Sequence, residues 1–346
     1  MGKDKPVVLI MCGGKSQRLW PLSENKSKNF LDVLGFSPLE YTIKRFLKIT
    51  PCKNIFLVAN RKEAKHLKSL NIIKRENIFF EPQSRNTAAA VCLSLCYLKS
   101  YFHPRKPIVI TPVDHLITKE DKFYNGLNVS LAAAAKGYLC TLGIKPKDPS
   151  SDFGYIQSGK RISKNVYYVK RFIEKPSLPV ARKLIKKGGV FYNSGMFIAS
   201  LDTLKQEYKT YYPYYNDFAQ AVKAKSIEGL YKRLPSSPFD KTIMEHTKKS
   251  ALVKGDFSWC DFGTWPAIWQ ALAKDKNGNA KKGRAYFDKS SNSFIYLEQE
   301  KKSILALGLK NIFFIDTGRY ALIAHRSFLD NIKTALKEFR RHGFPK

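Results

Sequence analysis

The sequence predicts an α/β protein with a doubly wound, mainly parallel sheet. Short apolar runs alternate with helical patterns over roughly the first 200 residues, beginning with the run at 7–11. Polar motifs follow several of these runs directly. Ligands of such folds bind beyond the carboxyl ends of the strands, so the alternation of strands and helices that predicts the fold also indicates where a site should lie.

The first half of the chain supplies the alternating elements. Ser37, Pro38 and Glu40 have the spacing of a capping box with proline at the first helical position, and they predict a helix start. Helical patterns predict further helices at 61–70 and 123–136, and a long apolar helix at 87–101. We expect buried strands at 7–11, 55–59, 78–80, 107–111 and 138–144.

The second half is mixed and ends in a small β-rich module. Strands are expected at 166–174 and 191–200, with a lysine-rich helix at 179–187 between them. A polar, glycine-rich stretch at 274–284 indicates a boundary, which predicts domains at 1–274 and 285–346. Beyond it we expect short strands at 294–297, 303–307, 312–315 and 321–324 and a helix at 327–341.

The charge balance indicates an anionic partner without identifying it. There are 61 basic and 28 acidic side chains, which gives a formal net charge of +33. Nucleic acid, anionic membrane surfaces and phosphorylated small molecules are all candidates, although the lysines are dispersed as on a solvated surface. No apolar run approaches the ~20 residues that cross a bilayer. Six scattered cysteines without a C-x-x-C pair favour a reducing, cytoplasmic setting.

The first strand runs into Gly13 and Gly14. Glycines at this place let the backbone approach a phosphate, whose oxygens the following amides can then bind. Arg18 and Lys28 add cations a short distance further on. Taken alone, the two glycines fit a tight turn equally well, and the spacing matches neither common phosphate-loop pattern.

Two further strand ends carry polar groups. Glu81, Arg85, Asn86 and Thr87 join a strand to a helix, where a helix cap is the plainer interpretation. Asp114 follows the fourth strand, a favourable place for an Mg²⁺ ligand, although a simple turn would also explain it.

The order and spacing of these segments resemble the sugar-nucleotide pyrophosphorylases. The R-N-T-A and N-S-G-M-F segments are similar to those of the guanylyl branch of that family. The resemblance covers residues 7 to about 270. In chain order the segments read G-G-x-x-x-R-L-W-P-L-S at 13–23, K-N-F-L at 28–31, E-P-x-x-R-N-T-A at 81–88, D-H at 114–115, G-Y-I at 154–156, E-K-P at 174–176, N-S-G-M-F at 193–197 and D-F-G-T-W at 261–265.

The resemblance implies a Rossmann-like nucleotidyltransferase domain with a β-helix-like tail. The implied reaction is Mg²⁺-dependent transfer from GTP to mannose 1-phosphate, which gives GDP-mannose and pyrophosphate. Family tails of this kind also imply a possible homodimer through the C-terminal module.

The resemblance also implies roles for single residues. Gly13 and Gly14 would bind phosphate, Arg18 and Lys28 would neutralise phosphate charge, and Asp114 and Asp261 would bind Mg²⁺. Lys175 would bind the sugar phosphate, and contacts to the sugar would come from Gly154, Glu174 and Asn193. The base and ribose pocket would be lined by Glu81, Arg85, Asn86 and Thr87.

The chain departs from the family pattern at a few positions. Ser16 stands where the third glycine is usual, and Ser27 replaces the proline before Lys28. None of these departures removes a charged group that the chemistry needs. Two alternatives therefore stay open: the same chemistry with another sugar 1-phosphate or nucleotide, and a catalytically inactive relative that binds polyanions or nucleic acid.

Overall fold

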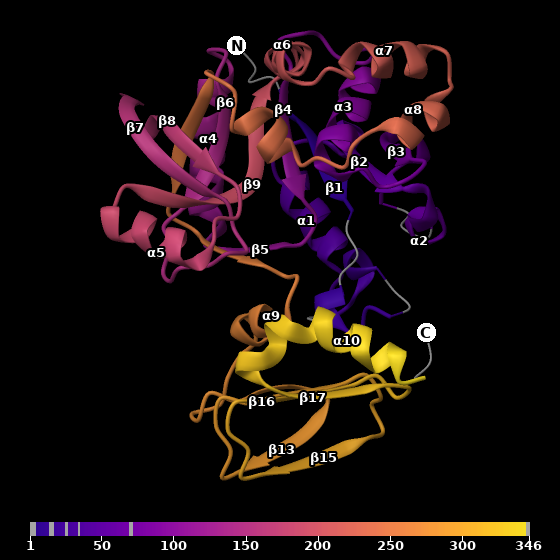
Figure 1. Cartoon of the computed structure of the whole chain (residues 1–346), viewed down its shortest axis with the longest axis vertical. Coiled ribbons are helices and arrows are strands. Elements are labelled where there is room, and N and C mark those ends of the chain that lie inside the picture. The colour runs from indigo at the N-terminus through magenta and orange to yellow at the C-terminus, as the bar shows by residue number, and fades with distance from the viewer. Residues whose placement is uncertain (1–4, 14–16, 25–26, 34, 69–71, 344–346) are drawn as a thin grey trace. The chain divides into compact units, whose positions relative to one another are not determined.

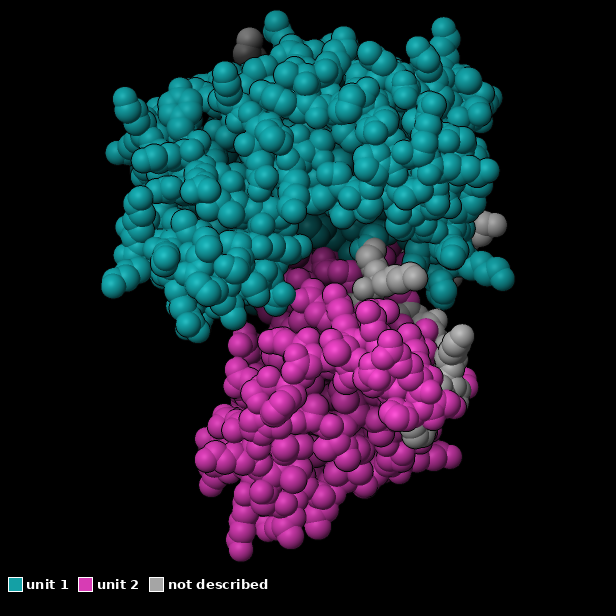
Figure 2. Space-filling view, in the orientation of Figure 1, with its two compact units in different colours: residues 1–13, 43–113, 117–259 teal, residues 14–42, 114–116, 260–346 magenta. Residues whose placement is uncertain are grey.

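The computed structural model describes residues 5–13, 17–24, 27–33, 35–68 and 72–343. The chain divides into two compact units (Figure 2). Unit 1 comprises residues 1–13, 43–113 and 117–259, and unit 2 comprises residues 14–42, 114–116 and 260–346. This division does not follow the boundary expected near 274–284, because two earlier segments are grouped with residues 260–346. The functional domain boundary stays a prediction.

Within the described residues, unit 1 is built on a mixed sheet of nine strands in the order β3-β2-β1-β4-β9-β6-β10-β8-β7 (Figure 1). The strands are β1 (Val7–Cys12), β2 (Ile55–Asn60), β3 (Ile78–Glu81), β4 (Pro107–Pro112), β6 (Leu139–Ile144), β7 (Tyr155–Ser163), β8 (Val166–Ile173), β9 (Val190–Ser200) and β10 (Ser250–Gly255).

The strand directions create a switch point beside β1. Strands β1, β2, β3 and β4 are mutually parallel, with β1 between β2 and β4. The order therefore reverses at β1, where open α/β sheets bind their ligands. Strand β9 runs antiparallel to both β4 and β6, and its pairing with β6 is irregular between Thr141 and Gly143. The expected doubly wound α/β fold is confirmed, but the sheet is mixed and not mainly parallel, because β9, β8 and β7 form antiparallel pairs.

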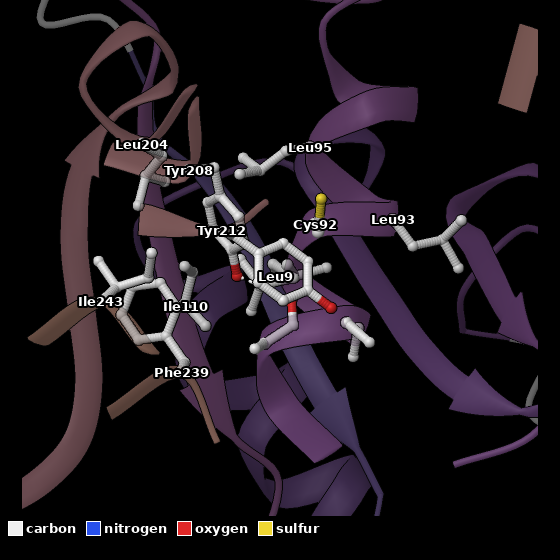
Figure 3. Packing of buried hydrophobic residues seen from close by; sticks show 14 of the residues in the cluster. Leu9, Cys92, Leu93, Leu95, Ile110, Leu204, Tyr208, Tyr212, Phe239 and Ile243 are labelled. Atoms are coloured by element: carbon white, nitrogen blue, oxygen red, sulfur yellow. Dashed lines mark hydrogen bonds between the residues drawn. The ribbon is translucent and has the colours of Figure 1, made fainter. Parts of the chain in front are cut away.

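Helices cover both faces of this sheet. Alternate strand residues such as Leu9 and Ile110 pack into one buried cluster with Cys92 of α3 (Asn86–Leu98) and Tyr208 of α6 (Leu201–Tyr211), as Figure 3 shows. On the other face, Leu142 packs against α4 (Glu120–Ala134). The remaining helices of unit 1 are α2 (Ala64–Lys68), α5 (Leu178–Lys187), α7 (Tyr215–Lys223) and α8 (Ile227–Arg233).

The sequence signature for a helix start at Ser37 is confirmed. The amide of Glu40 donates to Ser37 Oγ at 3.2 Å, and the amide of Ser37 donates to Glu40 Oε2 at 3.3 Å. These reciprocal bonds are the capping box, and they satisfy two amides that the first helical turn would otherwise leave unbonded. Helix α1 (Pro38–Leu47) follows.

Unit 2 contains the β-rich module expected at the C-terminal end. Parallel pairings join β12 to β14 and β14 to β16, β17 pairs antiparallel with β16, and β13 pairs parallel with β15. Successive parallel strands in separate small sheets agree with the β-helix-like expectation. The elements are β12 (Ala280–Lys282), β13 (Arg284–Asp288), β14 (Phe294–Leu297), β15 (Ser303–Leu307), β16 (Ile312–Asp316), β17 (Ala321–His325), α9 (Trp265–Ala271) and α10 (Ile332–Arg341).

A separate hydrophobic core holds unit 2 together. Trp20 and Leu31 from the early segments pack with Trp265, Phe294 and Phe313. The indole nitrogen of Trp265 donates to the carbonyl of Trp20 at 2.9 Å. Two motifs that are 245 residues apart in the sequence are therefore fixed to each other. Among the described residues, no helix is both long and apolar enough to cross a membrane.

Candidate functional site

Four of the predicted catalytic residues lie together in unit 2. Lys28 Nζ forms an ion pair with Asp114 Oδ2, and the Arg18 guanidinium lies 3.9 Å from Asp261 Oδ2. The Lys28 and Asp114 side chains are mostly buried, at 17% and 9% exposure. Lys28 begins a short 3-10 helix (Lys28–Phe30), and Arg18 lies in another (Gln17–Leu19).

Backbone contacts of unit 2 bring the two aspartates to one place. The amide of Phe262 donates to the carbonyl of Asp114 at 2.7 Å, so the residue after Asp261 is tied to Asp114 itself. Thr264 then caps α9, because its hydroxyl accepts from the amide of Ala267 at 3.3 Å. The D-F-G-T-W segment is thus a strand end followed by a capped helix start.

The charges of this cluster are strongly coupled. Burial disfavours the ionised form of Asp114, but the Lys28 cation outweighs it and holds the pKa of Asp114 well below its usual range. Burial, followed by the Asp114 charge, raises the pKa of Asp261 to about 7. Burial also works against charge on Lys28, yet Asp114 and Asp261 together raise the pKa of this ammonium group. The cluster therefore holds one firmly ionised carboxylate and one that a further cation would help to ionise.

The two aspartates suit a hard divalent cation. Within the described ranges, Asp261 Oδ1 is buried and has no hydrogen-bond partner, although a buried carboxylate oxygen normally needs one. No group of three or more histidine, cysteine or acidic side chains that could hold a metal occurs in the described part of the chain. Magnesium is commonly held by one or two carboxylates together with substrate phosphates, and the two aspartates fit that pattern.

The glycine loop is only partly described. Gly13 directly follows β1 and is exposed, and a methyl group added there would meet no atom within 4 Å. Gly14 and Ser16, which were expected to shape the phosphate loop, lie outside the described residues.

The predicted sugar-phosphate residues form a second group, in unit 1. The amide of Asn193 donates to the carbonyl of Gly154 at 2.8 Å, which joins the start of β7 to β9. A methyl group on Gly154 would lie 2.6 Å from Glu174 Oε2 and 3.3 Å from the Asn193 side chain. Any side chain at position 154 would therefore displace the Glu174 carboxylate, and Gly154, Glu174 and Asn193 line one place in the fold.

Lys175 lies beside them in an unusual backbone conformation. Its φ is +46°, in the left-handed region, although the next residue is Pro176. Non-glycine residues rarely take that conformation, which is stored strain of the kind found at functional sites. The ammonium group is 3.3 Å from Glu174 Oε1, and the side chain is 61% exposed. An exposed cation fixed beside a buried carboxylate is well placed to meet an incoming phosphate.

The predicted base-pocket residues make a third group, also in unit 1, and most of their contacts are internal. Glu81 is buried and accepts from Tyr231 Oη at 3.2 Å, and burial raises the pKa of its carboxyl to about 7. Arg85 donates to the backbone carbonyls of Tyr231 and Lys232, at the end of α8. A cation at that end of a helix satisfies free carbonyls.

Asn86 and Thr87 open helix α3. Asn86 has φ of +67°, and its side chain accepts from the amide of Thr87 at 2.8 Å, which satisfies one amide at the start of the helix. Arg85, the residue before the helix, makes no side-chain capping bond. The Thr87 hydroxyl accepts from the amide of Phe239 at 2.7 Å. The contacts of these base-pocket residues show that they hold neighbouring segments of unit 1 in place. Their role in nucleotide binding stays a prediction.

Sequence reasoning missed two acidic residues of the sugar group. Asn193 Nδ2 donates to Asp240 Oδ1 at 2.7 Å, and Glu245 Oε1 accepts from the amide of Glu174 at 3.0 Å. Both lie in or next to a π-helical turn, Asp240–Met244. The available signal for Asp240 was limited to apolar residues at helical spacing, with Phe239 one position before it and Ile243 three positions after it.

A family model described as nucleotidyl transferase matches residues 7–278. The chain belongs to the nucleotidyl transferase family. Residues 7–278 include every predicted site residue of this nucleotidyltransferase. The expected enzyme class is confirmed.

Curated relatives of this nucleotidyltransferase match over nearly its whole length. A mannose-1-phosphate guanylyltransferase of Escherichia coli is 30% identical over 97% of this chain and 76% of its own. One of Sinorhizobium fredii is 33% identical over 84% of this chain and 60% of its own. The resemblance to the guanylyl branch is thereby confirmed.

Solved structures support the same fold. A Thermus thermophilus protein described as a mannose-1-phosphate geranyltransferase matches this nucleotidyltransferase with a TM-score of 0.88 and 27% identity, over 97% of this chain and 99% of that one. A Helicobacter pylori protein described as a mannose-6-phosphate isomerase matches with a TM-score of 0.60 and 27% identity, over 74% of this chain and 100% of that one. The first match extends through the C-terminal β-rich module.

Proposed function

We propose that this nucleotidyltransferase transfers a guanylyl group from GTP to mannose 1-phosphate, giving GDP-mannose and pyrophosphate. The observation that carries the proposal is the paired cluster of Arg18, Lys28, Asp114 and Asp261, in which two cations face two carboxylates within one unit. The names of the curated relatives support the choice of GTP and mannose 1-phosphate.

The proposed reaction needs no nucleophile from the protein. An oxygen of the sugar phosphate, already an anion near neutral pH, attacks the α-phosphorus of GTP in line. The bond from that phosphorus to the leaving pyrophosphate breaks, and the electron pair leaves with the pyrophosphate. Bringing two anions together and stabilising the charge on the phosphates are the main tasks, so positioning and electrostatics carry most of the catalysis.

The cluster in unit 2 is suited to binding the phosphate groups of the nucleotide and of the leaving pyrophosphate. Arg18 offers a forked cation, and Lys28 a compact one whose pKa is raised by its acidic neighbours. Both would offset the charge of the triphosphate and of the leaving pyrophosphate. Asp114 and Asp261 would hold Mg²⁺, which would offset the charge of the phosphates when it is bound.

The cluster in unit 1 is suited to the sugar phosphate. Lys175 would bind its phosphate, and the carboxylate of Glu174 would accept hydrogen bonds from sugar hydroxyls. The Asn193 amide would supply a donor, since its Nδ2 carries two hydrogens and only one is used by Asp240. Gly154 would leave the room that any side chain there would take from Glu174.

A substrate panel tests the proposal. The purified chain is incubated with each of the common nucleoside triphosphates and with mannose, glucose, galactose and N-acetylglucosamine 1-phosphates, and pyrophosphate release is measured with Mg²⁺ and with excess chelator. We expect the highest kcat/KM for GTP with mannose 1-phosphate, and loss of turnover with chelator. A higher kcat/KM for another pair would keep the chemistry and overturn the substrates. No turnover with any pair would favour the inactive polyanion-binding alternative.

A further inference from the structure

Asp240 is a half-buried acid that none of the proposed roles uses. It lies at the start of the π-helical turn Asp240–Met244, which follows the loop after α8. Single π-helical turns are uncommon and often mark functional positions, because the extra residue redirects the side chains around it. The Asp240 Oδ1 atom accepts a hydrogen bond of 2.7 Å from Asn193 Nδ2, across 47 residues of sequence.

The bond to Asp240 completes a set of contacts that fixes the Asn193 amide. Its Oδ1 accepts from the Thr141 hydroxyl at 3.1 Å and from the amide of Gly195 at 3.1 Å. If the amide turned over, its NH₂ group would face the Gly195 N–H and its oxygen would face Asp240. Both new contacts are unfavourable, so Asp240 and Gly195 together determine which atom of Asn193 remains for a ligand.

The turn that carries Asp240 is rigidly anchored. Phe239 and Ile243 point into the main core of unit 1 beside Tyr208 and Ile110 (Figure 3). On the other side, the amide of Phe239 donates to the Thr87 hydroxyl at the start of α3. A carboxyl held by its neighbours in this way can orient another side chain without moving itself.

Asp240 also shares its surroundings with a second carboxyl group. Burial, and then the charge of Glu174, raise the pKa of Asp240 to about 7, while Lys175 and the Asn193 hydrogen bond act in the opposite direction. Glu245 is a third acid nearby, since it accepts the amide of Glu174. Near neutral pH the Asp240 carboxyl group is therefore partly protonated, which lowers its repulsion of a phosphate.

We propose that Asp240 is a positioning residue for the sugar phosphate: its carboxyl group accepts the Asn193 hydrogen bond and so orients the Asn193 amide toward the sugar. This inference rests on the proposed function, because it assigns the group around Asn193 to the acceptor substrate. It adds to that function a residue that sets acceptor binding and its dependence on pH.

Kinetics of two variants test the inference. Asp240→Asn keeps an oxygen that can accept from Asn193 and cannot ionise, whereas Asp240→Ala removes the acceptor. We expect Asp240→Ala to raise KM for mannose 1-phosphate about tenfold with KM for GTP nearly unchanged, as the loss of a positioned hydrogen bond would. Asp217→Asn serves as the control, because Asp217 pairs with Arg233 on the exposed side of α7.

The pH profile separates positioning from a merely structural role. Above pH 7 wild-type Asp240 ionises and repels the phosphate, so its KM for mannose 1-phosphate should rise relative to that of Asp240→Asn. At pH 6 the two KM values should agree. Overlapping profiles for wild type and Asp240→Asn, or equal rises in both KM values for Asp240→Ala, would overturn the inference.

A stability measurement distinguishes failure of the inference from failure of the proposed function. The pKa of Asp240 is raised on folding, so the stabilisation tied to its protonated form is complete below pH 4 and is lost as pH rises through 7. Asp240→Asn should therefore raise Tm relative to wild type at pH 8 and not at pH 4. If the wild-type protein converted no sugar phosphate, the proposed function would fail, but the Tm difference between Asp240→Asn and wild type could still be measured. A Tm difference independent of pH would contradict the raised pKa of Asp240.

Discussion

At the scale of single residues, the Lys28–Asp114 pair carries the clearest expectation. Lys28→Met should lower turnover at least a hundredfold, because it removes a cation from the phosphate site. It should also cost about 3 kcal/mol of stability, since it leaves the buried Asp114 charge unpaired. Steady-state kinetics and thermal unfolding at pH 7 measure the two effects.

A double variant then separates catalysis from folding. Adding Asp114→Asn to Lys28→Met removes the unpaired charge, so most of the lost stability should return while turnover stays low. Recovery of turnover together with stability would show that the pair is only structural. Lys48→Met is the matched control, because Lys48 pairs with Glu120 on the surface.

Gly263 is a second residue whose substitution should act on the site directly. A methyl group there would lie 2.9 Å from Asp261 Oδ1 and 3.4 Å from the Arg18 guanidinium. Gly263→Ala should therefore displace the Asp261 carboxylate and lower kcat about tenfold or more, as displacement of a catalytic group by a fraction of an ångström does.

The control for Gly263→Ala is Gly229→Ala. Gly229 lies in α8 and has nothing within 4 Å of the added methyl, so that variant should keep full activity. It should gain up to about 1 kcal/mol, because alanine is the better helix former. Unchanged kcat in Gly263→Ala would show that Asp261 tolerates displacement.

At the scale of elements, the start of α3 tests whether Asn86 does more than cap a helix. Its φ of +67° suits glycine, so Asn86→Gly should keep most of the stability, while Asn86→Ala should cost about 1 kcal/mol or more. If the side chain also contacts the nucleotide, both variants should raise KM for GTP several-fold. A KM for GTP that rises only in the alanine variant would leave Asn86 with a structural role alone. Titration of GTP with each variant decides.

Elements with a one-sided or continuous apolar pattern could be predicted from the sequence. The strand expected at 55–59 is β2 (Ile55–Asn60), and the capping signature at Ser37 marks the true start of α1. Strands β7 and β10 were missed. The outer part of β7 is exposed and its pairing with β8 is irregular, so no clean alternation remains in its sequence.

The same limit applies to the site. Arg18, Lys28, Asp114 and Asp261 stand in recognisable motifs, and the structure groups their side chains in unit 2. Asp240 belongs to none of the motifs on which the family resemblance rests, and its hydrogen-bond partner Asn193 is 47 residues away in the sequence. Its importance depends on a contact that only the folded sheet and the π-helical turn create. Local sequence could suggest an acid in an apolar setting but not what it orients.

At the scale of the whole molecule, the formal net charge of +33 predicts a dependence on salt. Both proposed substrates are polyanions, so the positive field should raise their local concentration near the protein. Raising the ionic strength from about 0.05 M to about 0.5 M shortens the Debye length below the size of the site. We expect kcat/KM for GTP to fall about tenfold while kcat changes little, since the groups that contact the phosphates are less screened than the surface.

The distribution of the lysines determines whether the salt dependence of kcat/KM comes from the whole surface or from one part of it. Lys183, Lys186 and Lys187 are exposed on α5 and belong to none of the proposed sites. If the field is a property of the whole surface, reversing these three to glutamate should flatten the salt dependence only slightly. The measurement is kcat/KM against ionic strength for wild type and the triple variant. A flat wild-type curve would show that the dispersed charge has no part in substrate capture, and a collapse of the curve in the triple variant would place the effect in α5 alone.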